Sequence, residues 1–154
     1  MRIHTLHREQ RLPGTPEEVF PFFADAFNLE AITPPLLRFR VVTPAPIDMG
    51  VGTFIQYALR IRGLPVRWDT LIQAWEPPFR FVDTQVRGPY RLWHHTHTFV
   101  QDGDDTLMTD VVRWSAPLDR VAAPLVRRDV EAIFDFRRQA LRTLDVRTRA
   151  LRAH

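Results

Sequence analysis

The stretch that decides the fold is residues 90–115, which read YRLWHHTHTFVQDGDDTLMTDVVRWS. Side chains of a β-strand point alternately to its two faces, and both halves of this stretch alternate in polarity. Asp102-Gly103-Asp104 separates the halves and is typical of a hairpin turn. The stretch therefore predicts two antiparallel strands, over residues 90–101 and 106–115.

Upstream of this hairpin, turn residues divide the chain into further short segments of strand character. The connections at Gly63, at Glu76-Pro77-Pro78 and at Gly88-Pro89 are too short for a parallel crossover, which needs a dozen residues or more. We therefore expect an antiparallel meander. Its strands are predicted over residues 3–12, 38–43, 52–62, 66–75 and 80–87.

Two short helices are predicted between the first two strands. Thr15-Pro16-Glu17-Glu18 combines a capping threonine, a proline at the first helical position and acids in the first turn. Val19, Phe20, Phe22 and Phe23 supply the apolar side of this helix. A second short helix is expected over residues 28–32, where Pro34-Pro35 ends it.

Downstream of the hairpin the periodicity changes to that of a helix. From Asp119 onward, apolar residues from Val126 to Leu144 recur at helical spacing on one face. Roughly 25 helical residues would be ~37 Å long, enough to cross a whole sheet. The order of elements predicts an α+β fold, in which a curved antiparallel sheet of about seven strands wraps around one long C-terminal helix. One helix cannot fill the concave side of such a sheet, so we expect an internal cavity suited to a small molecule.

The composition is that of a globular protein. The chain has 154 residues, which suits a single domain over residues 1–154. There is no cysteine, which excludes disulfides, thiolate metal sites and cysteine nucleophiles. No apolar run reaches the ~20 residues of a membrane span, and the first ten residues resemble no secretory signal, so we expect a cytoplasmic protein without integral membrane association.

The basic residues do not indicate nucleic acid. All 21 are arginines and the formal net charge is +3, but the arginines are spread along the chain. The arginine-rich segment over residues 137–152 is interpreted as the solvated end of the last helix, where cations complement the helix dipole. We therefore predict no nucleic-acid partner.

Strand alternation predicts which residues face the cavity. In the strand over residues 90–101, one face carries aromatic residues and histidines, while the other carries His94, Thr96 and Thr98 and fits solvent. A shift of one residue in register would reverse these assignments. The alternation in the strands and the helical spacing of the last helix together predict a ligand-binding wall. Its residues are Tyr57, Trp68, Thr70, Phe81, Asp83, Gln85, Trp93, His95, His97, Asp110, Trp114, Ile133 and Arg137.

Arg137 interrupts the apolar face of the last helix between Ile133 and Leu141. It could pair with Asp83 or Asp110, or bind an anionic ligand head group. An ordinary surface salt bridge is the alternative interpretation. Another segment, Thr33-Pro34-Pro35-Leu36-Leu37, is either an entrance lip of the cavity or a plain packing loop.

Three stretches of the sequence resemble a known protein family. The stretches TPEEVFPFFADAFNLEAITPPLLRFRV, LRIRGLPVRWDTLIQAWEPPFRFVDTQVRGPYRLWHHTHTF and TLMTDVVRW are similar to the START-like, or SRPBCC, superfamily, in its bacterial polyketide cyclase/dehydrase-like branch. The resemblance covers most of residues 15–114 and implies the helix-grip fold. It also implies a pocket for a hydrophobic or aromatic small molecule, without implying one reaction.

Three interpretations of His95 and His97 compete. Two imidazoles on one side of a strand, with a carboxylate as third ligand, could hold a metal ion, but two ligands from one strand are a weak signal. A histidine held by Asp83 or Asp110 could instead act as an acid or base. From the sequence alone we favour a third interpretation, in which both histidines are wall residues that orient a ligand. We therefore expect no metal and no cofactor.

The predicted function is the binding or transport of a hydrophobic or aromatic small molecule, lipid-like or polyketide-like, in an internal cavity. The alternative is an enzyme similar to polyketide cyclase/dehydrases, with His95 or His97 as the base and Asp83 or Asp110 orienting it. A module that senses a ligand is a third class. No hydrolase triad pattern surrounds Ser115 and no phosphate-binding glycine loop occurs. The protein is expected to be a monomer or a homodimer.

Overall fold

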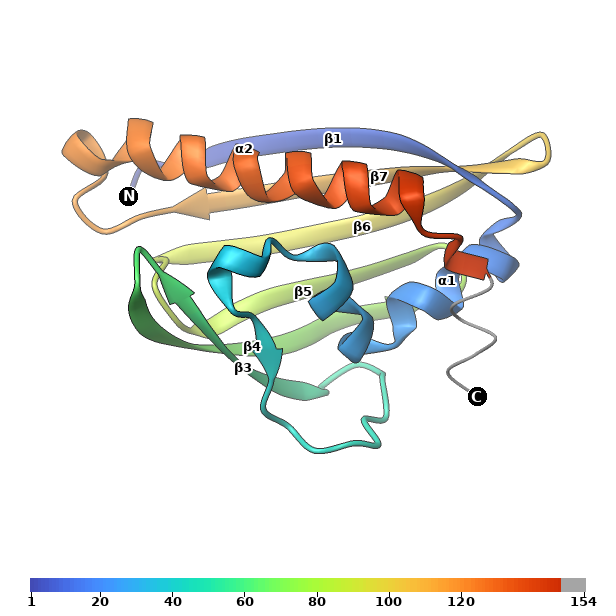
Figure 1. The fold of residues 1–154 in the computed structure, drawn as a ribbon, viewed down its shortest axis with the longest axis horizontal. Coiled ribbons are helices and arrows are strands. Elements are labelled where there is room, and N and C mark those ends of the chain that lie inside the picture. Colours follow the sequence, from blue (N-terminus) through green and yellow to red (C-terminus); the bar gives the residue numbers. More distant parts are fainter. Residues whose placement is uncertain (148–154) are drawn as a thin grey trace.

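The chain folds into one antiparallel sheet with a long helix lying along it (Figure 1). The structure is a computed structural model, and it describes residues 1–147. The seven strands lie in the order β1-β7-β6-β5-β4-β3-β2. In chain order they are β1 (His4–Pro13), β2 (Arg40–Val41), β3 (Phe54–Ile61), β4 (Leu64–Glu76), β5 (Arg80–Arg87), β6 (Leu92–Asp102) and β7 (Asp105–Ser115).

Four helical segments accompany the sheet. They are α1 (Pro16–Ala24), the 3-10 helices η1 (Ala26–Ile32) and η2 (Pro35–Leu37), and α2 (Asp119–Thr143). The prediction of a meander of about seven strands followed by one long helix is confirmed. No helix within residues 1–147 has the length and apolarity that a bilayer crossing requires.

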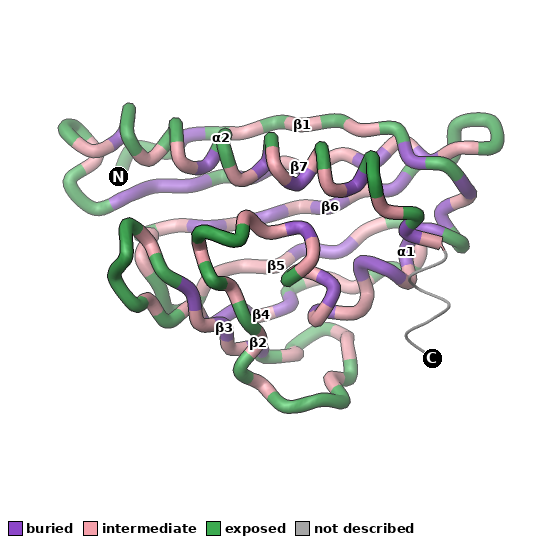
Figure 2. The backbone as a smooth tube through the Cα atoms, in the orientation of Figure 1, coloured by how far each residue is buried: buried purple, intermediate pink, exposed green. Residues whose placement is uncertain are grey.

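The register of β5, β6 and β7 brings polar residues from three strands together. His95 is opposite Asp83 of β5, and His97 is opposite Asp110 of β7. Every second residue of β6 from Trp93 to Phe99 is buried, and the alternation of buried and less buried positions is visible along β6 in Figure 2. Because side chains alternate along each strand, this register gathers the histidines and the carboxylates on the concave face.

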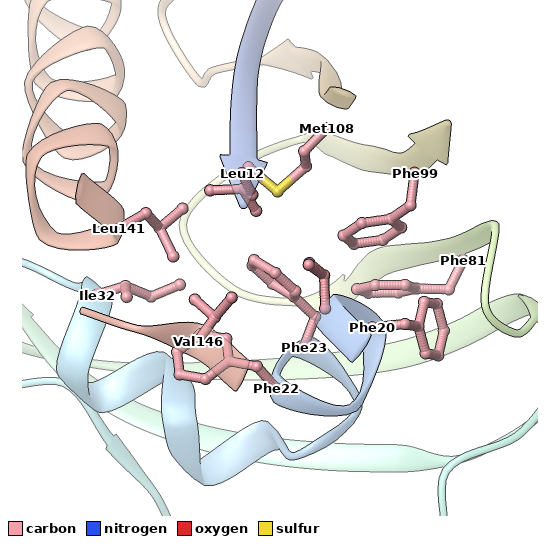
Figure 3. Packing of buried hydrophobic residues seen from close by; sticks show 11 residues of the cluster. Leu12, Phe20, Phe22, Phe23, Ile32, Phe81, Phe99, Met108, Leu141 and Val146 are labelled. Atoms are coloured by element: carbon pink, nitrogen blue, oxygen red, sulfur yellow. The ribbon is translucent and has the colours of Figure 1, made fainter. Parts of the chain in front are cut away.

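α1 closes one end of the structure. Thr15 caps its first turn, as the sequence predicts, and forms a capping box in which Thr15 and Glu18 bond to each other's backbone amides. Phe20, Phe22 and Phe23 of this helix then pack into a core cluster with residues of β5, β6 and β7 (Figure 3). The other members of that cluster are Leu12, Val19, Ile32, Phe81, Phe99, Met108, Leu141 and Val146.

α2 presents one buried stripe to the sheet. Ala123, Val130, Phe134, Arg137 and Leu141 are its buried residues, spaced three, four or seven apart, as expected for one face of a helix. The predicted solvated arginine segment is therefore wrong at its first residue, because Arg137 belongs to the buried stripe. Residues 148–152 of that segment lie outside the described part of the chain.

Two predicted elements differ from the structure. The strand expected over residues 38–43 pairs only at Arg40 and Val41, because η2 precedes it and Arg38 adopts a left-handed conformation with φ of 45°. The second helix is of the 3-10 type and begins earlier, at Ala26, where the Asp25 side chain accepts a hydrogen bond from the Phe27 amide. These short segments form the wall of the cavity that faces the sheet.

Candidate functional site

A cavity of about 590 Å³ lies between the sheet, α2 and the segments η1 and η2. This volume lies within the range of small-molecule sites, which is about 300–1,000 Å³. β3 and β4 contribute Tyr57 and Trp68, and β5 and β6 contribute the polar group formed by Asp83, His95 and His97. The walls are otherwise mainly apolar, so the cavity has one polar end inside an aromatic and aliphatic enclosure.

Most of the predicted wall residues do line this cavity. They are Tyr57, Trp68, Thr70, Phe81, Asp83, Trp93, His95, His97, Ile133 and Arg137. Whether they contact a ligand stays a prediction. Trp68 and Trp93 meet edge to face, with 5.1 Å between ring centroids, so the aromatic wall is itself packed.

Gln85, Trp114 and Asp110 do not line the cavity. The Gln85 side chain turns to the backbone of Tyr90, whose carbonyl accepts from its amide nitrogen at 2.7 Å. Trp114 stacks on His4 at 4.3 Å between ring centroids and lies in the core beneath α2. Asp110 is buried one layer behind the histidines, so it reaches the cavity only through them.

Several wall residues were missed or misplaced by the sequence analysis. Arg60 and Arg62 are exposed and also border the cavity, where Arg62 donates two hydrogen bonds to Asp129 of α2 at 3.0 and 3.1 Å. Tyr90, just before β6, replaces Gln85 on the wall. In the proposed lip, Thr33, Pro34, Leu36 and Leu37 do border the cavity, and Leu36 is exposed.

The polar end is a cluster of two histidines, two aspartates and one arginine. His97 Nε2 lies 2.6 Å from Asp83 Oδ2, and His95 Nε2 lies 2.8 Å from Asp110 Oδ1. His97 Nδ1 lies 3.3 Å from the same Asp110 oxygen, and Arg137 Nη2 approaches it to 3.5 Å. Both histidines are buried, with their rings stacked 3.6 Å apart. The Phe81 ring stacks on the other side of His97 at 3.9 Å.

The electrostatics of the cluster shift the pKa values of the two histidines in opposite directions. Burial, together with the charge of His97, lowers the pKa of His95 to about 4, so His95 is neutral at pH 7. Burial also opposes the charge of His97, but the carboxylates of Asp110 and Asp83 outweigh it and raise the pKa of His97 above its ordinary value.

Both aspartates are ionised. Burial alone would raise the pKa of Asp110, but the Arg137 charge and the hydrogen bonds from His95 and His97 hold it well below the ordinary value. Burial likewise opposes the charge of Asp83, and the hydrogen bond from His97 with the nearby cations keeps its pKa lowered. The two carboxylates are thus offset by Arg137 and by their contacts with the two histidines, and buried charges need such partners.

Two features of this cluster bear on chemistry. Asp83 retains 19% of its side-chain surface and lines the cavity, so it can accept a hydrogen bond from a bound molecule. One ligand atom each from Asp83, His95 and His97 lies within 4.8 Å of the other two, close enough to hold a metal ion. The arrangement can therefore orient a polar group, take part in proton transfer or bind a cation.

A curved antiparallel sheet that grips a long helix over a cavity defines the helix-grip class of ligand-binding folds. The chain belongs to the family described as polyketide cyclase / dehydrase and lipid transport, whose model matches residues 4–144. The resemblance inferred from the sequence to SRPBCC proteins of the cyclase/dehydrase branch is thereby confirmed. No curated protein sequence matches the chain.

Solved structures of similar fold include proteins of different activity. One is the Zhui aromatase/cyclase from a Streptomyces species, with a TM-score of 0.72, 14% identity and coverage of 98% of this chain and 95% of that one. Another is norcoclaurine synthase from Thalictrum, with a TM-score of 0.65, 12% identity and coverage of 92% and 96%. The protein TTHA0849 from Thermus thermophilus has a TM-score of 0.65, 21% identity and coverage of 97% and 99%. At these identities the likeness concerns the fold alone.

Proposed function

We propose that the protein binds a hydrophobic small molecule, with an aromatic or polycyclic body and one hydrogen-bonding group, inside the cavity. The observation that carries this proposal is the cavity itself, which is about 590 Å³ in volume, apolar along its walls and polar at one end. Burial of apolar area supplies the affinity for such a molecule, while a few fixed polar groups supply its orientation. The family, whose description includes lipid transport, supports the same function.

The ligand is expected to point a hydroxyl or another donor at Asp83. Asp83 is the ionised group of the cluster that still has free surface, and an ionised carboxylate only accepts hydrogen bonds. Trp68 of β4 and Trp93 of β6, on the two strands that flank β5, offer flat apolar ring surface to the body of the molecule. An anionic head group at this end is disfavoured, because it would meet the carboxylate directly.

A cyclase or dehydrase activity is the second candidate, favoured by the His–Asp contacts beside the cavity. Acid–base catalysis is most efficient when the pKa of the catalytic group lies near the working pH. The pKa of His95 is lowered to about 4, which makes this histidine a poor base at neutral pH. The pKa of His97 is raised by its contacts with Asp110 and Asp83, so His97 is the better candidate for an acid or base in an enzyme of this kind.

The decisive experiment is native mass spectrometry of the protein purified from its own host. We expect one retained hydrophobic molecule, and we expect the variant Ile133→Trp, which fills the cavity from α2, to retain none. Glu131→Trp is the matched control, because Glu131 is an exposed position of the same helix and should leave binding unchanged.

Two results would contradict the proposal. Equal retention by Ile133→Trp and the wild type would place the ligand elsewhere. A ligand whose mass falls by one water during incubation with the protein, but not with Asp83→Asn, would favour the cyclase or dehydrase interpretation.

A further inference from the structure

Three potential ligand atoms converge at the polar end of the cavity, from two different strands. We propose that Asp83, His95 and His97 form a binding site for a divalent first-row transition metal ion. One ligand atom of each residue lies within 4.8 Å of the other two. Two nitrogens and one carboxylate oxygen are a donor set that suits Zn²⁺, Fe²⁺ or Co²⁺ and is a poor match for Mg²⁺ or Ca²⁺, which prefer oxygen.

The distances fit an ion after a small adjustment. Ligand atoms about 2.1 Å from a tetrahedral metal lie about 3.4 Å from each other. Asp83 Oδ2 is 2.6 Å from His97 Nε2 and 3.9 Å from His95 Nδ1, so the observed separations bracket that value. A rotation of the Asp83 carboxylate would equalise them. The ion would take the place of the proton that His97 Nε2 donates to Asp83, and that proton would leave to solvent.

The free nitrogen of His95 points to a missing partner. His95 Nε2 lies 2.8 Å from Asp110 Oδ1, so this contact pairs Nε2 with Asp110 and leaves Nδ1 as the nitrogen that faces the cavity. Among residues 1–147, no side chain or backbone group donates a hydrogen bond to this nitrogen. It instead faces the carboxylate of Asp83 at 3.9 Å, with two electron-rich atoms directed toward one point. A cation between them would satisfy both.

The surroundings of the histidines are those of a metal site. Metal-bound histidines characteristically direct their second ring nitrogen at a carboxylate, which orients the ring and strengthens the ligand. Asp110 does this for both histidines at once, 2.8 Å from His95 Nε2 and 3.3 Å from His97 Nδ1. Arg137 balances the charge of Asp110 from behind at 3.5 Å. Asp110 is therefore a positioning residue and not a ligand.

The site would remain open on the side of the cavity. Three protein ligands leave at least one coordination position, which a water molecule or an oxygen of a bound molecule can take. This inference goes beyond the proposed function and does not depend on it, because the metal ion alone is the probe. If the metal site fails, hydrophobic ligand binding is untouched, and metal binding without any hydrophobic ligand is equally measurable. With the ion bound, the polar group of the ligand would meet the ion in place of Asp83.

The test uses the full chain, stripped of metal with EDTA and titrated with Zn²⁺ by calorimetry and with Co²⁺ by visible absorption. We expect saturation at one equivalent and Co²⁺ bands typical of four or five ligands. Asp83→Asn and His95→Gln should each weaken binding by at least about tenfold, and Asp110→Asn should weaken it about 10–100-fold without changing the stoichiometry. Asp83→Asn is the variant of choice, since it preserves shape and can still accept a hydrogen bond from His97.

The matched control is His94→Gln, because His94 lies on the same strand directly before His95 but on its opposite face. This variant should bind metal as the wild type does. The proposal is overturned if the stripped protein takes up no stoichiometric Zn²⁺ or Co²⁺. It is also overturned if folded Asp83→Asn, verified by circular dichroism, binds these ions as tightly as the wild type.

Discussion

The pKa values of His95 and His97 are shifted in opposite directions although the two residues lie only two positions apart on one strand. His97 touches carboxylates through both of its ring nitrogens, whereas His95 touches Asp110 through one and presents the other to the cavity. The cluster therefore keeps two buried carboxylates beside Arg137 and the two histidines. At the scale of single residues its stability depends on Arg137, which is 7% exposed and lies over the rings of Phe23 and Phe134 at 5.7 Å.

We expect Arg137→Met to destabilise the protein by about 3 kcal/mol, measured by urea unfolding. Removal of one partner of a buried ion pair typically costs about 3–5 kcal/mol, because the other charge stays buried. The lower end applies here, since the histidines still hydrogen-bond Asp110 and the methionine keeps much of the packing. Arg142→Met, at an exposed position of the same helix, should change stability by less than about 0.5 kcal/mol.

The double variant Arg137→Met with Asp110→Asn separates charge from packing. Its loss of stability should be smaller than the sum of the two single losses, because the second substitution removes the charge that the first leaves unbalanced. Strict additivity would mean that the two residues do not interact.

At the scale of elements, α1 positions the aromatic end of the cavity through its cap. Thr15 and Glu18 fix the first turn, and the helix then directs three phenylalanines into the core shown in Figure 3. Phe23 also lines the cavity. Loss of the cap should therefore lower the stability of the protein and change the shape of the cavity.

We expect Thr15→Ala to lower the free energy of unfolding by about 1 kcal/mol, because the amide of Glu18 loses its side-chain acceptor. Glu17→Gln is the control in the same turn. Glu17 is exposed and outside the capping box, so its substitution should cost only about 0.3 kcal/mol through the helix dipole. Equal effects of the two variants in thermal or urea unfolding would show that the box contributes nothing.

At the scale of the whole molecule, an ion pair spans the mouth of the cavity. Arg62, at the tip of the β3–β4 hairpin, bonds to Asp129 of α2, and both line the opening. The pair joins the tip of this hairpin to the helix that the sheet grips, beside the cavity that both residues line. Arg62 and Asp129 keep 54% and 39% of their side-chain surface, so the contact is exposed to solvent and open to screening.

We expect Asp129→Ala to speed the release of a bound hydrophobic fluorophore several-fold in stopped-flow measurements. Stability should change by less than about 1 kcal/mol, because exposed ion pairs contribute little to folding. High salt should speed release from the wild type but not from the variant. Asp135→Ala removes an ion pair between the same helix and β1, 2.6 Å from Arg8 and away from the mouth, and should leave release unchanged.

Much of the fold could be predicted from the sequence because its signals are local. The turn residues between strands, the capping box at Thr15 and the apolar stripe of α2 each lie within a few residues of the structure that they specify. The short strand β2 was overestimated, since the left-handed Arg38 has no marked sequence signal. Alternation also identified most of the cavity wall, because the face of a strand residue follows from its position alone.

The functional cluster depended on contacts that the sequence does not contain. Asp83, His95, Asp110 and Arg137 come from four separate elements, and only the pairing of β5, β6 and β7 under α2 decides which carboxylate meets which nitrogen. Trp114 and Gln85 illustrate the same limit. Alternation predicts that both face the cavity, but Trp114 stacks on His4 and the Gln85 side chain bonds to the Tyr90 backbone. The sequence by itself thus determined the elements and their buried faces, which follow from local periodicity. The tertiary structure alone decided the size of the cavity, the carboxylate that each histidine meets and the convergence of three ligand atoms, because these arise from distances between segments far apart in the chain.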